Sequence, residues 1–234
     1  MRVLAIGCHP DDLEIGCGGT LARYAEEGHD VFMCHVANGD KGHAIIMPDE
    51  LREIRINEAY EAGKLLGASS VFNIDVPDLL VKSGNEETVL KIMEVIRFTK
   101  PDLIITHDPD DYMEDHRQTS QLVFDASFSA SVPHYETTSK ATGIVPLYYM
   151  DTLAGINFNP EQYVDITKYI DLKLEALNKH ESQVKWMIDH DNIDFLDFVK
   201  TVSKFRGLQC NVAYAEGFRE CKTWPRGQTK RLLP

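Results

Sequence analysis

The sequence of 234 residues contains no run that approaches the ~20 consecutive apolar residues of a transmembrane helix. Its apolar N-terminal run ends at His9 and Pro10 and is too short for the hydrophobic core of a signal peptide. The five cysteines are odd in number and lack CxxC spacing, which favours free thiols in a reducing compartment. We therefore expect a cytoplasmic protein without a membrane span.

Positive charge is also scarce, with 24 Lys and Arg against 37 Asp and Glu and a formal net charge of −13. An acidic surface repels the phosphates of nucleic acids and anionic lipids. We expect neither a nucleic acid nor a membrane as partner, and a small-molecule substrate fits this charge better. No repeat, low-complexity tract or linker interrupts the chain, so one domain spanning residues 1–234 is expected.

Short apolar runs alternate with segments of helical periodicity along the chain. The pattern predicts strands at 3–8, 31–37, 70–74, 102–106 and 146–151, and helices at 18–28, 48–67, 86–99 and 116–130, with mostly helix beyond. This alternation is typical of an α/β domain with a mainly parallel sheet and helices on both faces. Binding sites in such sheets lie at the carboxyl ends of strands, here just after Cys8, Ala37, Ile74 and Thr106.

Two of these four positions carry dense groups of His and acidic residues. His9-Pro10-Asp11-Asp12 follows the first predicted strand, and the segment 107–116 follows the fourth. Acids crowded at one sheet edge repel one another unless a cation gathers them. Histidine combined with carboxylate favours zinc or another first-row metal over magnesium or calcium.

A catalytic zinc ion uses about three protein ligands and keeps one position open for water. His9 and Asp12 lie on one tight loop and His116 can approach from the next, so these three are the predicted ligands of one Zn²⁺ per subunit. Asp11 is left free to take a proton from the metal-activated water. For HPDD alone, a strand-end turn with an Asp helix cap is an equal alternative, and the second His-bearing loop favours the metal.

The glycines at 16–20 show neither GxGxxG spacing nor a GK[ST] ending, so a nucleotide-binding loop is not indicated. We expect them to let a helix start close under the metal loop. Cys8 and Cys17, which flank that loop, are expected to be small buried packing residues.

These residues resemble the LmbE/PIG-L family of metal-dependent N-deacetylases. The segment 9–20 (HPDDLEIGCGGT) is close to the family's first signature, and Asp115-His116 matches its second metal motif. Further matches are 55–67 (RINEA with LLG), 173–183 (KLEALNKHESQ) and 214–218 (YAEGF), in the expected order over nearly the whole chain.

The resemblance implies a Rossmann-like fold, zinc held by His9, Asp12 and His116, and Asp11 as general base. It also implies hydrolysis of the acetamide of an N-acetylglucosamine-type sugar or conjugate, and a homo-oligomer. Many family members carry a second His three residues before the His of the second motif, thought to polarise the carbonyl. This chain has Met113 there, and Met cannot donate a hydrogen bond. The candidate substitutes are His107, Tyr112, His134 and His180.

Four further positions have two interpretations each. By resemblance Arg55 faces the site and holds a polar substrate group, or else it is a solvated helix Arg paired with Glu58. Asp115 orients an imidazole of the metal site or caps a helix, and Asp40 orients Lys41 or a ligand, or only shapes a turn. His180 is a site residue or a structural hydrogen-bonding group. Three acids, Asp108, Asp110 and Asp111, are expected to form a solvated loop.

Three rival functions stay open on the sequence. One is an amidase for a bulkier acyl or thiol conjugate, and another is a metal- or ligand-binding module without catalysis. The third is an Fe(II) oxygenase, which uses a similar set of two His and one carboxylate; Fe²⁺ or another divalent first-row metal is thus an alternative to zinc.

Overall fold

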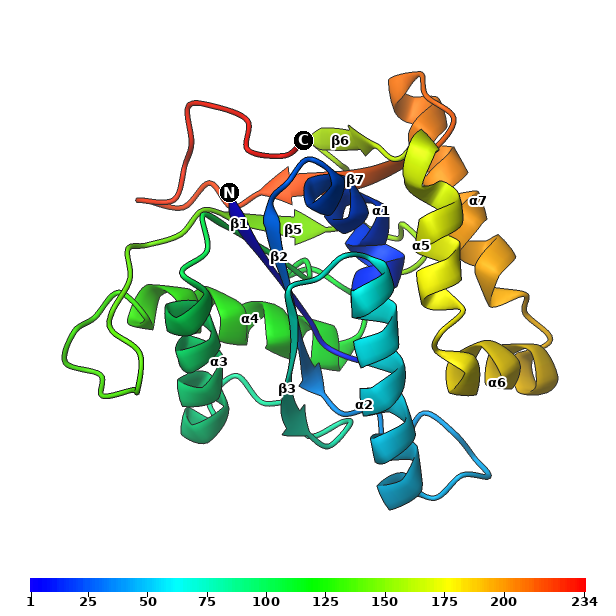
Figure 1. The fold of residues 1–234 in the computed structure, drawn as a ribbon, viewed down its shortest axis with the longest axis horizontal. Helices are drawn as coiled ribbons and strands as arrows, with labels where there is room; N and C mark the ends of the chain where they lie inside the picture. Colours follow the sequence, from blue (N-terminus) through cyan, green and yellow to red (C-terminus); the bar gives the residue numbers. More distant parts are fainter.

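The computed structural model describes every residue from Met1 to Pro234. In chain order its elements are β1 (Arg2–Gly7), α1 (Asp12–Glu26), β2 (Asp30–Ala37), α2 (Pro48–Leu65), β3 (Ser70–Val76), α3 (Glu86–Thr99), β4 (Leu103–Thr106), α4 (Glu114–Ser129), β5 (Leu147–Met150), β6 (Gln162–Asp165), the 3-10 turn η1 (Thr167–Tyr169), α5 (Ile170–Leu177), α6 (Glu181–Asp191), α7 (Phe195–Cys210) and β7 (Ala215–Glu220). The strands form one sheet in the order β3-β2-β1-β4-β5-β7-β6. Figure 1 shows helices on both sides of this sheet, which confirms the predicted α/β architecture.

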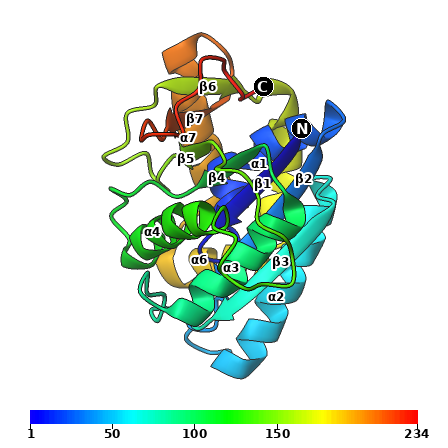
Figure 2. The same ribbon diagram turned by 90° about the vertical axis from the view of Figure 1, so that its left-hand side faces the viewer.

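The apolar strands are explained by burial on both faces of the sheet. Val3 and Ala5 of β1 pack into one hydrophobic core, whereas Leu4 and Ile6 pack into the other. Successive side chains of a strand point to opposite faces, so a strand covered on both sides needs apolar residues at every position. Helices α1, α2 and α5 cover the first face and α3 and α4 the second (Figures 1 and 2).

The order of the strands places the site. β1 pairs in parallel with β2 on one side and with β4 on the other. The chain steps outward from β1 to β3, returns to β4 and then continues in the opposite direction to β5. The carboxyl ends of β1 and β4 therefore flank the crevice where the strand order reverses, which is where open α/β sheets bind ligands. Both predicted clusters follow these two strands.

Two parts of the predicted secondary structure are wrong. Helix α1 begins at Asp12 rather than at Gly18, and its glycines serve close packing instead: a Cβ on Gly19 would lie 2.8 Å from Ile166. The segment beyond Asp151 contains two strands besides its helices, and β7 runs antiparallel to β5 and β6. No helix separates β5 from β6 and three α-helices separate β6 from β7, so a regular alternation of strands and helices does not reveal β6 and β7.

The free state of the cysteines and the burial of Cys8 and Cys17 agree with the sequence predictions. All five cysteines are free thiols. Cys17 and Cys8 lie in the two opposite cores, as expected for small packing residues. No helix is both long and apolar enough to cross a membrane.

Candidate active site

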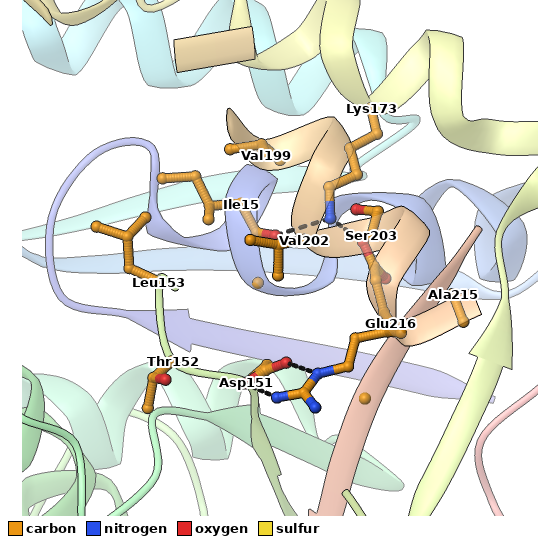
Figure 3. A pocket seen from close by; sticks show the side chains of 13 residues that line it. Ile15, Asp151, Thr152, Leu153, Lys173, Val199, Val202, Ser203, Ala215 and Glu216 are labelled. Carbon is orange, nitrogen blue, oxygen red and sulfur yellow. Dashed lines mark hydrogen bonds and ion pairs between the residues drawn. The ribbon is translucent and has the colours of Figure 1, made fainter. Parts of the chain in front are cut away.

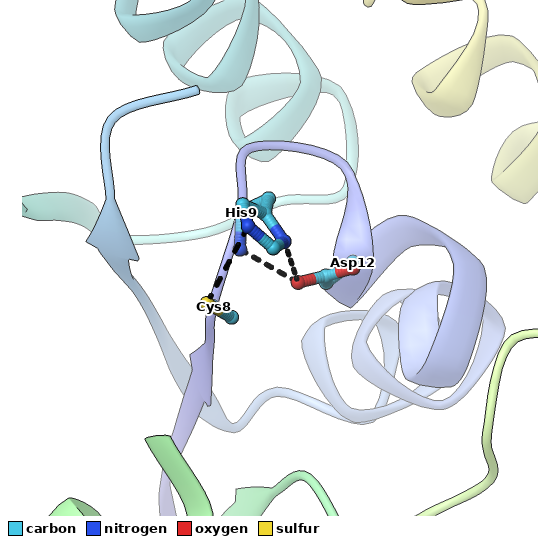
Figure 4. A group of neighbouring side chains, drawn as sticks. All are labelled: Cys8, His9 and Asp12. Carbon is cyan, nitrogen blue, oxygen red and sulfur yellow. Dashed lines mark hydrogen bonds and ion pairs between the residues drawn. The ribbon is translucent and has the colours of Figure 1, made fainter. Parts of the chain in front are cut away.

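The loop between β1 and α1 turns sharply at Asp11, the N-cap residue of α1. Its φ of 125° lies in a region that residues other than glycine rarely adopt. The turn returns the chain on itself, so that the backbone N–H of His9 donates to Oδ2 of Asp12 at 2.6 Å (Figure 4). Backbone strain of this kind is typical of functional sites.

The Oδ2 atom of Asp12 is the centre of the cluster. Nε2 of His107 lies 3.2 Å from it, Nε2 of His116 3.4 Å and Nδ1 of His9 3.5 Å. Burial opposes the ionisation of Asp12, but the imidazoles of His116 and His107 outweigh it and hold the pKa of Asp12 well below its ordinary value. The structure thus brings His9, Asp12 and His116 together around one carboxylate.

His116 is oriented by a carboxylate that the sequence analysis placed in a solvated loop. Its Nδ1 atom lies 3.1 Å from Oδ2 of Asp111, and both residues are buried. Its other ring nitrogen, Nε2, is buried and makes no hydrogen bond. One nitrogen held by a carboxylate and the other left free is typical of metal-binding histidines.

The prediction of a solvated acidic loop is therefore wrong for two of its three members. Asp111 and Asp108 are buried, and Oδ2 of Asp108 pairs with Nη2 of Arg219 at 2.6 Å. Only Asp110 is exposed. Nothing in the sequence distinguishes Asp111 from its acidic neighbours. Its partner His116 comes within reach only because the first turn of α4 folds back toward it.

Asp115 orients the other histidine. Its Oδ2 atom lies 3.4 Å from Nε2 of His9 and accepts the backbone N–H of Leu79 at 2.7 Å. Helix α4 has no side-chain cap, so of the two interpretations of Asp115 the structure favours the imidazole partner. With Nε2 of His9 turned to Asp115, Nδ1 faces Asp12.

His107 does not line the larger pocket in front of the cluster, but it lines a small cavity together with Asp12 and His116. Its ring stacks on that of His116 with centroids 3.9 Å apart, and its Nε2 accepts the backbone N–H of Cys8 at 2.8 Å. Burial, reinforced by His116, lowers the pKa of His107 and so favours the neutral form of the ring. Potential ligand atoms lie within 4.8 Å of one another in two overlapping groups, Cys8-His9-Asp12 and Asp12-His107-His116.

A pocket of about 260 Å³ opens in front of the cluster. In it, Nη2 of Arg55 lies 3.0 Å from Oδ2 of Asp11 and also donates to the carbonyl of Pro10. Burial raises the pKa of Asp11 to about 6, although the Arg55 guanidinium lowers it. Arg55 is only 3% exposed, so the interpretation as a solvated helix residue is wrong. Its predicted partner Glu58 instead accepts two hydrogen bonds from Ser182.

The remaining wall of the pocket comes mostly from residues that the sequence analysis did not single out. The polar members are Gly42, Asp78 and Gln183, and the apolar ones are Ile15, Met113, Leu153, Met187 and Phe195. Asp78 accepts the backbone N–H groups of Gly39 and Lys41 at 2.8 and 3.1 Å. Asp78 comes just after the carboxyl end of β3, one of the four strand ends where a binding site was expected. The rule that sites lie at such strand ends could therefore have found it. The apolar members come from distant parts of the chain and carry no such signal.

Four predicted candidates do not reach the pocket. Asp40 holds Nζ of Lys41 at 3.0 Å and accepts the backbone N–H of Asp78 at 2.9 Å, so it both orients Lys41 and shapes the turn. His180 is fully buried, with Nε2 3.4 Å from Oε2 of Glu14. Tyr112 is 44% exposed and His134 is exposed, and neither lines the pocket.

Two motifs from the C-terminal half support α1 instead of contributing to the pocket. Nζ of Lys173 donates to Oε1 of Glu216 at 2.6 Å and to the carbonyl of Ile15 at 2.7 Å (Figure 3). Glu216 also accepts the backbone N–H groups of Gly19 and Thr20 at 2.9 and 2.7 Å. The small cavity drawn in Figure 3 is lined by these groups and by the paired Asp151 and Arg206. Because its charges satisfy one another, it offers no unpaired charge to a ligand.

Comparison with known proteins gives consistent matches over most of the chain. The family model described as PIG-L, GlcNAc-PI de-N-acetylase, matches residues 4–127. The diacetylchitobiose deacetylase of Thermococcus kodakarensis is 27% identical over 226 residues, 93% of this chain and 82% of that protein. The crystal structure of the N,N'-diacetylchitobiose deacetylase of Pyrococcus horikoshii superposes with a TM-score of 0.80, at 27% identity over 94% of this chain and 83% of that one. The 4-oxalmesaconate hydratase of Pseudomonas putida is 24% identical, covering 92% of this chain and 87% of that protein.

Proposed function

The chain belongs to the PIG-L family, and from this premise we propose that it is a zinc-dependent N-deacetylase acting on a small N-acetylated amino sugar or amino-sugar conjugate. The observation that carries the proposal is the arrangement around Oδ2 of Asp12, with one nitrogen of His9 and one of His116 at 3.5 and 3.4 Å. Asp11 lies next to these three residues, is buried and is not one of the proposed metal ligands. The named deacetylases among the relatives support the same chemistry.

His9, Asp12 and His116 are the residues that would hold the metal. Ligand atoms on one tetrahedral zinc ion, each about 2.0–2.2 Å from it, lie about 3.4 Å apart, and the two distances to Asp12 match that spacing. Nε2 of His116 is buried and makes no hydrogen bond, so it is available as a ligand atom once its proton is released. His107 fits less well because its Nε2 lone pair already accepts the N–H of Cys8.

A zinc ion bound there supplies Lewis acidity, which polarises the amide carbonyl and acidifies a water molecule. Asp11 accepts the proton of the attacking water and returns it to the leaving nitrogen, giving acetate and the free amine. A general base works best with a pKa near the working pH, and burial moves the pKa of Asp11 toward neutrality. Arg55 fixes the Asp11 carboxylate by its contact at 3.0 Å.

Met113 lies in the pocket where many family members have a histidine, and it donates no hydrogen bond. None of the predicted substitutes lines this pocket, and His107 lines only the small cavity that it shares with Asp12 and His116, where its Nε2 already accepts the N–H of Cys8. Stabilisation of the oxyanion therefore rests mainly on the metal. Loss of one such donor typically lowers the rate about a hundredfold or more, so we expect a slow enzyme.

The test combines metal analysis with detection of free amine. Purified protein should contain about one zinc per subunit and release acetate and amine from N-acetylglucosamine or N,N'-diacetylchitobiose. Asp11→Ala should retain the metal and lose turnover, whereas Asp12→Ala should lose both. Full turnover by Asp11→Ala would remove Asp11 from the mechanism, and a fully metallated wild type silent on all N-acetyl sugars would refute the deacetylase.

Hydration of an unsaturated carboxylate is the second candidate function. A hydratase is among the relatives that match nearly the whole chain, and a reaction without an amide carbonyl has no need of the histidine replaced by Met113. The buried guanidinium of Arg55 is suited to a carboxylate. Adding an unsaturated dicarboxylate to the substrate panel separates the two functions.

A cytoplasmic location and a homo-oligomeric state stay predictions of the sequence.

A further inference from the structure

Two segments distant in sequence meet over the catalytic pocket. The β2–α2 loop, residues 38–47, contributes Gly42 to its lining, and helix α6 contributes Gln183 and Met187. Nε2 of Gln183 donates to the carbonyl of Gly42 at 3.3 Å. This hydrogen bond is long for an N–H···O contact, so it is a weak link between the two sides.

An aromatic contact joins the same two segments next to that hydrogen bond. The ring of His43 is tilted by 42° against Trp186 with centroids 4.6 Å apart, and within α6 the ring of His190 stacks on Trp186 at 4.1 Å and 20°. Trp186 is thus in contact with one imidazole from the loop and one from its own helix. Gln183, Trp186, Met187 and His190 are spaced three and four residues apart, so they lie on one face of α6.

The His43 ring is fixed to its loop, because its Nδ1 accepts the backbone N–H groups of Ile45 and Ile46, both at 3.1 Å. The first half of the loop is held separately by Asp78, through Gly39 and Lys41. In the second half the side chains of Ile45 and Met47 are exposed. The stack on Trp186 is therefore the main contact that fixes this half of the loop over the pocket.

Helix α6 is anchored at its first turn by polar contacts. The N–H and hydroxyl of Ser182 donate to Glu58 at 2.8 and 2.7 Å, and His180 just before it pairs with Glu14. Farther along, Lys185, Ile188 and Asp189 point to solvent. Beyond this first turn, α6 contacts the β2–α2 loop on the opposite side of the pocket through Trp186 and His43.

We propose that the stack of His43, Trp186 and His190 is a clasp that fixes α6 against the β2–α2 loop, and that Trp186 is a specificity-determining residue acting by positioning Gln183 and Met187 at the pocket. The part of the substrate held there is the sugar portion beyond the scissile amide, and this assignment rests on the proposed deacetylase function. Trp186 itself touches no reacting atom, so its effect falls on substrate binding.

The kinetic test compares N-acetylglucosamine with N,N'-diacetylchitobiose. Trp186→Ala should raise KM for the disaccharide about three- to tenfold, the size expected from losing the one aromatic contact between loop and helix, with a smaller change for the monosaccharide and kcat nearly constant. Trp186→Phe keeps a ring between the imidazoles and should restore most of the KM. Trp224→Ala is the control, since Trp224 is 91% exposed and lies outside the pocket lining. An equal fall in kcat for both sugars, or an unchanged KM, would overturn the specificity role.

Hydrogen exchange provides a readout that needs no activity. In Trp186→Ala the backbone amides of 42–47 and of the second half of α6 should exchange faster, because local opening becomes easier, while the strands β1 and β4 stay protected. Trp186→Phe and Trp224→Ala should exchange as the wild type does. Unchanged exchange of the loop in Trp186→Ala would refute the clasp. If the wild type hydrolyses neither sugar, the proposed function fails, and the exchange comparison still decides whether the clasp exists.

Discussion

Nδ1 of His116 lies 3.1 Å from Oδ2 of Asp111, and this contact leaves Nε2 of the same ring as the only nitrogen free to face Asp12. Burial lowers the pKa of His116, but the carboxylates of Asp12 and Asp111 together raise it to about 10. In the absence of a cation, a proton occupies the lone pair that a metal would take. Metal binding must therefore release a proton, and affinity should rise with pH.

Asp111→Asn should weaken metal binding about 10- to 100-fold, the usual effect of removing a carboxylate that orients a ligating histidine. Competition with a fluorescent chelator measures the affinity directly. Asp110→Asn is a matched control in the same loop, since the Asp110 side chain is 75% exposed. Equal affinities of the two variants would show that Asp111 does not orient His116.

The pH dependence of kcat/KM should report the ionisation of Asp11. Since burial raises the pKa of Asp11 to about 6, and the base acts when deprotonated, activity should fall as the pH drops through that value. A bound divalent cation adds positive charge nearby and lowers the pKa of Asp11. In the holoenzyme the acidic limb of the pH profile should therefore lie at or below a pH of about 6. Arg55→Gln removes a cation that favours the carboxylate and should move the limb to higher pH. Arg52→Gln, on the outer surface of α2, should leave it in place.

Met113→His should raise kcat with little change in KM, because it places a hydrogen-bond donor in the pocket beside His9. An oxyanion donor is typically worth about a hundredfold, and an imperfectly placed one should give about tenfold. Met113→Leu controls for the change of shape and should behave as the wild type does. A histidine variant no faster than the leucine variant would mean that another group already polarises the carbonyl.

The buried pair of Glu14 and His180 should stabilise the fold over a defined pH range. Burial opposes both charges, but each group favours the other's charged form, so the pKa of Glu14 is lowered and that of His180 is raised. The contribution of Glu14 is lost as the pH falls through its lowered pKa, and that of His180 as the pH rises through its raised pKa. Between these limits His180→Ala should cost about 3–5 kcal/mol, because it leaves a buried charge unpaired.

Thermal unfolding across pH measures this contribution. The difference in stability between the wild type and His180→Ala should be largest near neutral pH and shrink toward both extremes. Lys185→Ala breaks the exposed pair with Glu181 and should unfold close to the wild type at every pH. A His180→Ala difference that does not change with pH would show that the pair is neutral.

The fold was largely predictable because its parallel half follows a simple rule. Strands buried on both faces have apolar residues throughout, as in Val3 to Ile6, and amphipathic segments separate them. The rule failed for β6 and β7, because no helix separates β6 from β5 along the chain and three α-helices separate β6 from its antiparallel neighbour β7. It also misplaced the start of α1, because Gly18 and Gly19 serve packing inside the helix.

The candidate site was predictable where its residues are neighbours in the chain. The tight turn from His9 to Asp12 puts the proposed base and two proposed metal ligands together locally, and the second cluster follows a strand that pairs with the first. The carboxylates that orient the imidazoles were harder to assign. One of the two interpretations of Asp115 put it beside an imidazole, where the structure has it. Asp111 was expected in a solvated loop, since burial alone distinguishes it from Asp110.

The sequence by itself determined that the loops after β1 and β4 meet at one crevice, because local turn chemistry and strand order follow from patterns within short segments. Only the tertiary structure decided the charge states, the orientation of each ring and the wall of the pocket. Those properties depend on burial and on contacts such as Arg55 with Asp11 and Trp186 with His43. Residues so far apart in the chain are brought together only when helices α2 and α6 pack beside the sheet.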